Sequence, residues 1–222
     1  MTKSEYSEIE SYMLSAVKDS AHDKHHIYRV LNSAVDISKS ENSVDFDVLV
    51  TACLLHDIGR EKEFAAPTVC HAEIGAEMAY NFLLALNWTG EKALHVKECI
   101  ITHRYRGNKP PKTIEAKILF DADKIDAAGV LGIARTLIAG GLKAEALYLM
   151  NDDGEIITAA NTKRPSFFHE YNFKLKNIYD YFYTKRAKEI VGSRQKAAIN
   201  FYNDLYKEIT SNYDNGIKKY LL

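Results

Sequence analysis

The residues best suited to chemistry in this chain are His56 and Asp57, which directly follow the apolar pair Leu54-Leu55. Apolar residues upstream recur at i, i+3, i+4 and i+7, the spacing of one helix face, at Phe46, Leu49, Val50, Cys53 and Leu54. His56 and Asp57 extend this stripe, so we expect both to face the interior. A buried imidazole beside a buried carboxylate needs compensation, either by a divalent cation or by a hydrogen bond within the pair. The dipeptide alone leaves both interpretations open.

Other polar side chains fall on apolar helix faces in the same way. His26 lies one turn before Val30, His103 follows Val96, Cys99 and Ile100, and Asp123 follows Leu119 and Phe120, while His71 begins an apolar helix pattern. A single core histidine is usually satisfied by a backbone carbonyl. Several on successive helices are hard to explain without a shared ion.

The elements that carry these residues are predicted to be helices. Four prolines and eleven glycines leave long stretches with helical rather than alternating periodicity in the 222 residues, which predicts an all-α protein. Helices are expected over about 4–17 with Ser4 as N-cap, 22–38, 44–56 with a stop at Gly59, 71–86, from Thr89, from about 114 after Pro110-Pro111, and over about 187–205.

One region departs from the helical pattern. Gly140-Gly141 and Asn151 to Gly154 form a turn cluster, and the flanking segments 146–150 and 156–158 predict a short hairpin in an insertion or lid around 141–167. No repeat or linker interrupts the chain, so we expect a single domain over 1–222, with helices of 168–212 packed on its core.

Composition narrows the function classes. Hydrophobic residues make up 46% and charged residues 27%, with a formal net charge of -1, which gives no electrostatic reason to expect nucleic acid or a membrane as partner. The three cysteines show no C-x-x-C spacing, and the first residues are polar without an apolar signal segment. We therefore expect a cytoplasmic protein.

Three segments together resemble the HD-domain metal-dependent phosphohydrolases, whose ligands follow the order His, His-Asp, Asp. They are His22 to Val30, His56 to Gly59, and Asp121 to Asp126. The resemblance covers roughly residues 20–135 and implies a helical bundle with a metal ion held between its helices. It implies His26, His56, Asp57 and Asp123 as the ligands of a divalent ion, which is Mn, Mg, Fe, Ni or Zn.

The resemblance also implies the reaction. A divalent ion makes a bound water acidic and polarises a phosphoryl oxygen, so hydrolysis of a phosphate ester or anhydride is expected, with a nucleotide or other small phosphorylated metabolite as partner. Nearby cations would stabilise the developing charge. The expected catalytic residues are Asp57, Lys124 and Arg60, and the expected substrate-binding residues are His71, His103, Arg104, Arg106 and Lys124.

Several alternatives remain open at this point. His71 and His103 bind a second ion or contact the substrate phosphate, and we favour the contact with substrate. The runner-up function is an HD-type di-iron oxygenase that uses all six candidate ligands, and the third is a non-catalytic nucleotide-sensing module. The oligomeric state stays open between a monomer and a homo-oligomer.

Supporting and non-ligand roles complete the set. Arg29 and Asp126 are expected to pair and to orient the ligand helices. The histidines expected not to bind the ion are His22, His25, His95 and His169.

Overall fold

A computed structural model describes residues 1–17, 23–66, 68–104, 109–158 and 165–214, with side chains as far as residue 211. The chain divides into two compact units, Met1–Asp126 with Phe182–Ala187 and Ala127–Tyr181 with Lys188–Leu222. The sequence analysis expected a single domain over 1–222. The division into two units does not test this expectation, which stays a prediction. His22 and Arg106, and part of the predicted lid, lie outside the described residues.

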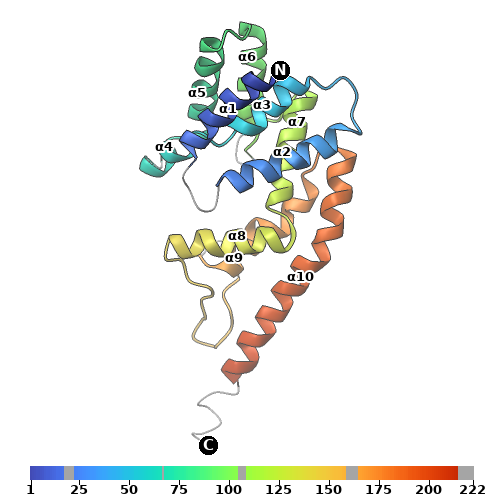
Figure 1. Cartoon of the computed structure of the whole chain (residues 1–222). Helices are drawn as coiled ribbons and strands as arrows, with labels where there is room; N and C mark the ends of the chain where they lie inside the picture. Colours follow the sequence, from blue (N-terminus) through green and yellow to red (C-terminus); the bar gives the residue numbers. More distant parts are fainter. Residues whose placement is uncertain (18–22, 67, 105–108, 159–164, 215–222) are drawn as a thin grey trace, which may run out of the picture. The chain divides into compact units, whose positions relative to one another are not determined.

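The all-α prediction is confirmed: the described residues form helices and two isolated β-bridges, and no extended strand (Figure 1). The helices of the first unit are α1 Lys3–Ala16, α2 Lys24–Ser38, α3 Phe46–Leu55, α4 Arg60–Ala65, α5 His71–Ala85, α6 Gly90–Thr102 and α7 Ile114–Asp126.

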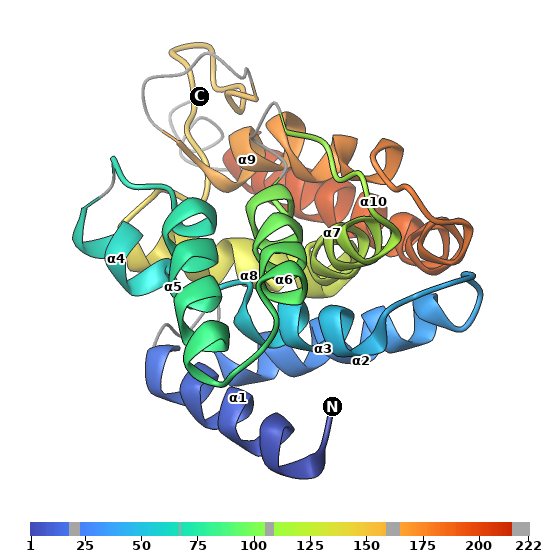
Figure 2. The same ribbon diagram turned by 90° about the horizontal axis from the view of Figure 1, so that it is seen from above.

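Helix α3 is the centre of the first unit. It contacts α1, α2, α5, α6 and α7, and the view in Figure 2 shows it between α2 and α6. Seven of its ten residues, from Val48 to Leu55, are buried. A helix this apolar must be covered by other elements on every side. The helices that pack around α3 include α2, α5, α6 and α7, which carry the other candidate histidines and Asp123.

The helix starts follow capping rules, with two corrections to the predicted boundaries. The N-cap of α1 is Thr2 rather than Ser4, since Thr2 and Glu5 form a reciprocal capping box. Helix α3 ends at Leu55 rather than at His56, so His56 is its C-cap and Asp57 lies in the turn beyond it. Thr89 caps α6 as predicted, with its side chain accepting from the N–H of Lys92.

Gly59 has a different role from the predicted helix stop. A Cβ atom at this position would collide with the carbonyl oxygen of His71 and lie 2.8 Å from the backbone nitrogen of Gly75. Only glycine allows this approach. The turn after Asp57 therefore lies directly against the first turn of α5, which brings His71 next to the His56-Asp57 pair.

The second unit contains α8 Gly129–Leu142, α9 Phe167–Phe173, the 3₁₀ helix η1 Leu175–Asp180 and most of α10 Lys185–Asp214. Its core is rich in aromatic residues and includes Ile133, Ile156, Phe167, Phe168, Tyr171, Leu175 and Ala198. The predicted hairpin is reduced to one antiparallel bridge between Met150 and Ile156. Helix α8 also continues through Gly140-Gly141, since neither glycine there adopts a positive φ.

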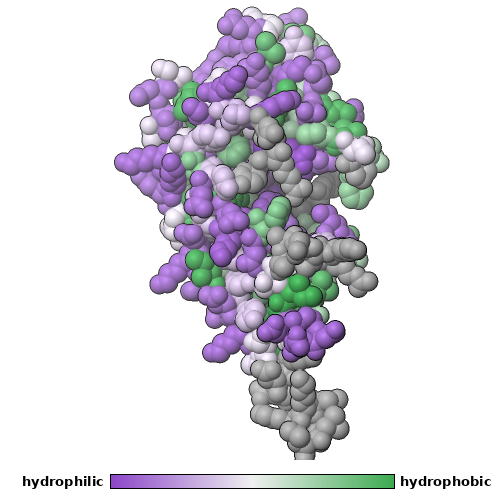
Figure 3. All heavy atoms as spheres, turned by 180° about the vertical axis from the view of Figure 1, so that it is seen from behind, coloured by the Kyte–Doolittle hydropathy of each residue, from purple (hydrophilic) through white to green (hydrophobic). Residues whose placement is uncertain are grey.

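Hydrophilic side chains predominate on the molecular face in Figure 3, where hydrophobic ones are scattered. Among the described residues, no single helix has the length and apolar character needed to cross a membrane, although α7 and α8 meet that requirement together as a bent pair.

Asp121 ties α7 to the segment 182–187. Its side chain is fully buried and accepts hydrogen bonds from the backbone nitrogens of Tyr183 and Thr184, at 2.9 and 2.7 Å, and from the Thr184 hydroxyl at 2.6 Å. Since α7 also carries Asp123, this anchor fixes the helix that supplies one candidate ligand.

Asp121→Asn should lower the free energy of unfolding by about 3 kcal/mol, because the amide group accepts fewer hydrogen bonds and carries no charge. Urea unfolding measures the change. The matched control is Asp36→Asn, which weakens an ion pair to Arg186 in the same segment at a carboxylate that is 39% exposed. The control should lose less than about 1 kcal/mol. Equal losses in the two variants would contradict the anchor role of Asp121.

Candidate metal centre

Six side chains that the sequence singled out lie together in the first unit, in two groups of three. The first group contains His26 of α2, His56 of the turn after α3, and Asp123 of α7. The second contains Asp57, His71 at the start of α5, and His103 at the end of α6. In each group the possible ligand atoms lie within 4.8 Å of one another.

In the first group, two imidazole nitrogens face each other, and both are acceptors when the rings are neutral. The Nδ1 atoms of His26 and His56 must donate, because their partners are an Asp126 carboxylate oxygen at 2.7 Å and the Cys53 carbonyl at 2.8 Å. In neutral rings, both Nε2 atoms then carry lone pairs, yet they lie only 3.3 Å apart. Two facing lone pairs repel unless a cation binds both.

The second group repeats this arrangement. His71 Nδ1 donates to Glu63 Oε2 at 2.6 Å, and His103 Nδ1 donates to the Ile100 carbonyl at 2.6 Å. The two Nε2 atoms again face each other at 3.3 Å. A neutral His71 therefore presents an acceptor to the centre of the site, not a donor for a phosphate oxygen.

Asp57 stands between the two groups and offers one oxygen to each. Its Oδ2 lies 3.5 Å from His26 Nε2 and 3.6 Å from His56 Nε2. Its Oδ1 lies 3.4 Å from His71 Nε2 and 3.7 Å from His103 Nε2. The side chain is fully buried, and among the described residues Oδ2 has no hydrogen-bond partner. A buried, unpaired carboxylate oxygen is costly and suits a metal ligand.

The charge states of these groups also suit a cation. Burial raises the pKa of Asp57, but the Arg60 guanidinium together with the surrounding histidines holds this pKa well below its usual range. Asp123 behaves alike, with Lys124 as the main opposing charge. Burial lowers the pKa of His56 to about 4. Ionised carboxylates and neutral imidazoles are the forms that bind divalent metals.

Three of the cations predicted to act in the site lie in the described part of the chain: Arg60, Lys124 and Arg104. Each contacts a carboxylate in or next to the cluster. Arg60 Nε donates to Asp57 Oδ1 at 2.9 Å. The buried Lys124 ammonium donates to Asp123 Oδ2 at 2.8 Å and to the His103 carbonyl at 3.0 Å. Arg104 donates to Glu63 and to the Cys70 sulfur, and so reaches the site only through Glu63.

Glu63 is a site residue that the sequence analysis missed. Its carboxylate accepts from His71 at 2.6 Å and from Arg104 at 3.0 Å, and it lies 3.5 Å from Arg60. It therefore fixes the His71 tautomer and holds two arginines. Its position three residues after Arg60, in the first turn after the His56-Asp57 turn, is the signal that could have identified it.

The remaining predicted roles fall outside the six-residue cluster. Arg29 binds Asp126 through two nitrogens, at 2.7 and 3.0 Å, and Asp126 in turn orients His26. Of the predicted non-ligands, His25 is exposed and His95 contacts Glu115 and Thr113. His169 belongs to the second unit, where it stacks on Phe173.

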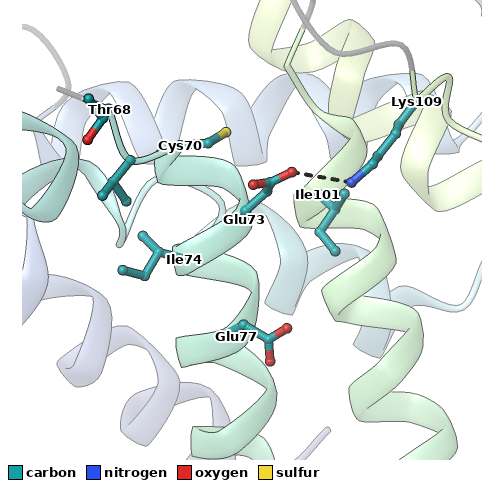
Figure 4. A pocket seen from close by; sticks show the side chains of 8 residues that line it. Thr68, Cys70, Glu73, Ile74, Glu77, Ile101 and Lys109 are labelled. Atoms are coloured by element: carbon teal, nitrogen blue, oxygen red, sulfur yellow. Dashed lines mark hydrogen bonds and ion pairs between the residues drawn. The ribbon is translucent and has the colours of Figure 1, made fainter. Parts of the chain in front are cut away.

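A groove of about 490 Å³ lies between the first turns of α5 and the end of α6 (Figure 4). Cys70 and Glu73 line it beside Ile101 and Lys109, and Glu73 pairs with Lys109 at 3.2 Å. Although Cys70 directly precedes His71, none of the six clustered residues lines this groove. The candidate chemistry therefore lies outside this groove.

Comparison with known proteins gives the family. The HD-domain family model matches residues 24–128, the span that includes all six clustered residues. The chain is 31% identical over 208 residues to the uncharacterized protein YpgQ of Bacillus subtilis, covering 91% of this chain and 92% of YpgQ. The chain belongs to the HD superfamily.

Structures of other members support the assignment of this HD protein. The crystal structure of YpgQ in complex with ADP matches with a TM-score of 0.69 at 27% identity, covering 92% of this chain and 97% of YpgQ. An HD-superfamily hydrolase of Bacillus thuringiensis matches with a TM-score of 0.70 at 26% identity, covering 95% of this chain and 99% of that protein.

A third relative shares only the HD region. The 3'-5' exoribonuclease YhaM of Halalkalibacterium halodurans is 27% identical over 117 residues, which is 46% of this chain and 37% of YhaM. Together the relatives place this HD protein in a family of hydrolases whose domains bind divalent metals, and both residue groups have the donor set for such an ion.

The metal-free protein should lose stability as the pH falls from about 6.5 to about 4. Unfolded His56 takes up a proton near 6.5, whereas folded His56 stays neutral to about 4, so the unfolded state binds more protons across this window. The loss attributable to His56 is on the order of 3 kcal/mol. Urea unfolding of chelator-treated protein at several pH values measures it.

His56→Gln should flatten this pH dependence by a similar amount, because glutamine does not titrate. The control is His25→Gln, since His25 is exposed. The interpretation fails if the pH slopes of His56→Gln and the unmodified protein coincide.

Proposed function

We propose that this HD protein hydrolyses a phosphate ester or anhydride of a nucleotide or another small phosphorylated metabolite. His26, His56, Asp57 and Asp123 would hold the divalent ion. The observation that carries the proposal is the 3.3 Å approach of two imidazole Nε2 atoms beside Asp57 Oδ2, an oxygen with no hydrogen-bond partner among the described residues. Those donors fit a cation and fit little else in a buried site.

A divalent ion bound there supplies an acidic water and a polarised phosphoryl oxygen. The chain's own residues then keep the donors in their binding forms. Asp126 holds the His26 ring with Nε2 toward the site, and Lys124 holds Asp123 with Oδ1 toward His26, at 3.5 Å from Nε2. These contacts prepare the ligand set before any ion binds.

Positive side chains would meet the phosphate charge. Lys124, Arg60 and Arg104 are the cations we assign to this role, and Arg106 is kept as a proposed contact from outside the described residues. Fixed cations in a site that excludes water stabilise developing negative charge more than they would in solution. His71 and His103 have their Nδ1 atoms committed as donors, which favours a supporting role over direct donation to phosphate.

The proposal of a nucleotide substrate draws support from two relatives. YpgQ has been crystallised with ADP, and YhaM is a 3'-5' exoribonuclease. ADP contains a phosphate anhydride, whereas RNA contains phosphate diesters. We extend the element that both names share, a nucleotide or a nucleotide polymer as ligand or substrate, to this chain.

A second candidate, the di-iron oxygenase, is favoured by one observation. The second group, Asp57, His71 and His103, offers a further complete set of ligands at the same spacing as the first. Against it, Asp57 Oδ1 is already paired with Arg60, and the relatives with a stated chemistry are hydrolases. Two tightly bound irons per chain after anaerobic purification, without phosphatase activity, would favour the oxygenase.

The experiment that tests the proposal is a substrate screen. Purified protein with manganese is offered nucleoside mono-, di- and triphosphates and generic phosphate esters, and release of phosphate or pyrophosphate is measured. We expect turnover of at least one nucleotide class. Absence of turnover with every compound and every divalent ion would favour the nucleotide-sensing module.

Asp57→Ala should abolish both hydrolysis and tight metal uptake, because it removes the carboxylate that offers one oxygen to each group. The helical fold should persist. Metal content by mass spectrometry and helicity by circular dichroism measure the two effects. Asp36→Ala, at a partly exposed carboxylate of the same unit, is the control. Full turnover in Asp57→Ala would remove Asp57 from the ligand set.

Lys124→Ala should keep the metal and lower kcat by roughly 100-fold, because a fixed positive charge beside the reacting phosphate is lost. Steady-state kinetics together with metal content separate the two effects. Lys117→Ala on the same helix is the matched control, since Lys117 is partly exposed and lies outside the cluster. Loss of the ion in Lys124→Ala would show that the contact with Asp123, and not charge stabilisation at the phosphate, is the main role of Lys124.

A further inference from the structure

The two ligand groups are alike in donors but unlike in charge. Each has two imidazole nitrogens facing at 3.3 Å and one oxygen of Asp57. On the first side, Oδ2 has no hydrogen-bond partner among the described residues, and Asp123 adds a second carboxylate. On the second side, Oδ1 already accepts a hydrogen bond from Arg60 at 2.9 Å.

Arg60 thus brings a permanent positive charge to the oxygen that a second cation would need. A guanidinium does not lose its proton in proteins, so pH does not remove this charge. Two positive charges at one carboxylate oxygen repel strongly in a buried site, where the effective dielectric constant is low. Arg60 and a second metal ion therefore compete for Asp57 Oδ1.

Neighbouring contacts hold Arg60 in this place. Arg60 Nη1 lies 3.5 Å from Glu63 Oε2, and the same oxygen accepts from His71 Nδ1 at 2.6 Å. The Arg60 side chain is only 27% exposed, although it lies on the short helix α4. Asp57 and Glu63 thus bind the guanidinium from two directions, which makes its displacement unfavourable.

We propose that Arg60 takes the place of a second metal ion: it weakens cation binding at Asp57, His71 and His103, so that the first group alone binds an ion tightly. This inference rests on the proposed metal centre and defines how many ions it holds. The number of ions is set by one side chain rather than by a lack of ligands, because both ligand groups are complete.

The test is a manganese titration of metal-free protein, in which electron paramagnetic resonance measures free Mn²⁺ and detects spin-coupled ion pairs. We expect the unmodified protein to bind one ion tightly and a second only at much higher concentration. In Arg60→Met the affinity for the second ion should rise by at least about tenfold, with a spin-coupled signal, because Oδ1 becomes available.

Three variants make the result specific. Arg60→Lys keeps a positive charge, so its second ion should stay weak, as in the unmodified protein. Arg104→Met removes a nearby charge that contacts Glu63 but not Asp57 and should change the second affinity less than Arg60→Met. Adding His103→Gln to Arg60→Met should remove the second ion and leave the first.

Two tight ions in the unmodified protein, or an unchanged second affinity in Arg60→Met, would overturn the inference. Circular dichroism shows whether each variant is folded, and Arg60→Gln, which also removes the charge, takes the place of Arg60→Met if that variant is unfolded. The stoichiometry is measured without substrate. A protein with one tight ion and no phosphohydrolase activity would therefore refute the proposed function while leaving the role of Arg60 intact.

Discussion

The candidate site depends on the repulsion between imidazole lone pairs that the fold forces to face each other. Four histidines have their Nδ1 atoms committed to carboxylates or backbone carbonyls: His26, His56, His71 and His103. Their Nε2 atoms are left as acceptors around Asp57. An all-acceptor cluster in a buried place raises the energy of the metal-free fold, and a cation reverses the sign of that interaction. The centre is therefore built to bind metal at the expense of stability without it.

The surrounding helices fit this requirement because each ligand is fixed by a contact outside the cluster. Asp126 and Arg29 orient His26, Lys124 holds Asp123, and Glu63 holds His71. The Gly59 turn lets α5 approach the end of α3. Metal ligands usually need such outer partners to fix ring orientation and tautomer. Here the partners come from α2, α4 and α7, so a change in any of these helices alters the ligand geometry.

Much of the fold could be predicted from the sequence, and the errors have local causes. Helical periodicity located α2, α5, α6 and α7, because their apolar faces are distinct. The end of α3 was placed one residue late, since His56 continues the apolar stripe and keeps helical backbone angles although it is the C-cap. The Ser4 cap was wrong because a reciprocal capping box at Thr2 and Glu5 competes with it. The predicted hairpin was too long, since an isolated turn signal does not require paired strands.

The candidate ligands could be predicted because the sequence shows residue types directly and burial through its apolar periodicity. It does not show which charged groups pair with each ligand. Glu63 was missed since it lies on a short polar helix without periodicity, and its role depends on three contacts formed only in the folded chain. The same holds for Arg60: its position next to the candidate ligands in sequence predicted that it stabilises developing charge, but its competition with a cation is inferred only from the 2.9 Å approach to Asp57 Oδ1. The spacing of residues in the sequence indicates which side chains can act as ligands. How many ions these ligands bind depends on whether each carboxylate oxygen already has a cationic partner, as Asp57 Oδ1 has in Arg60.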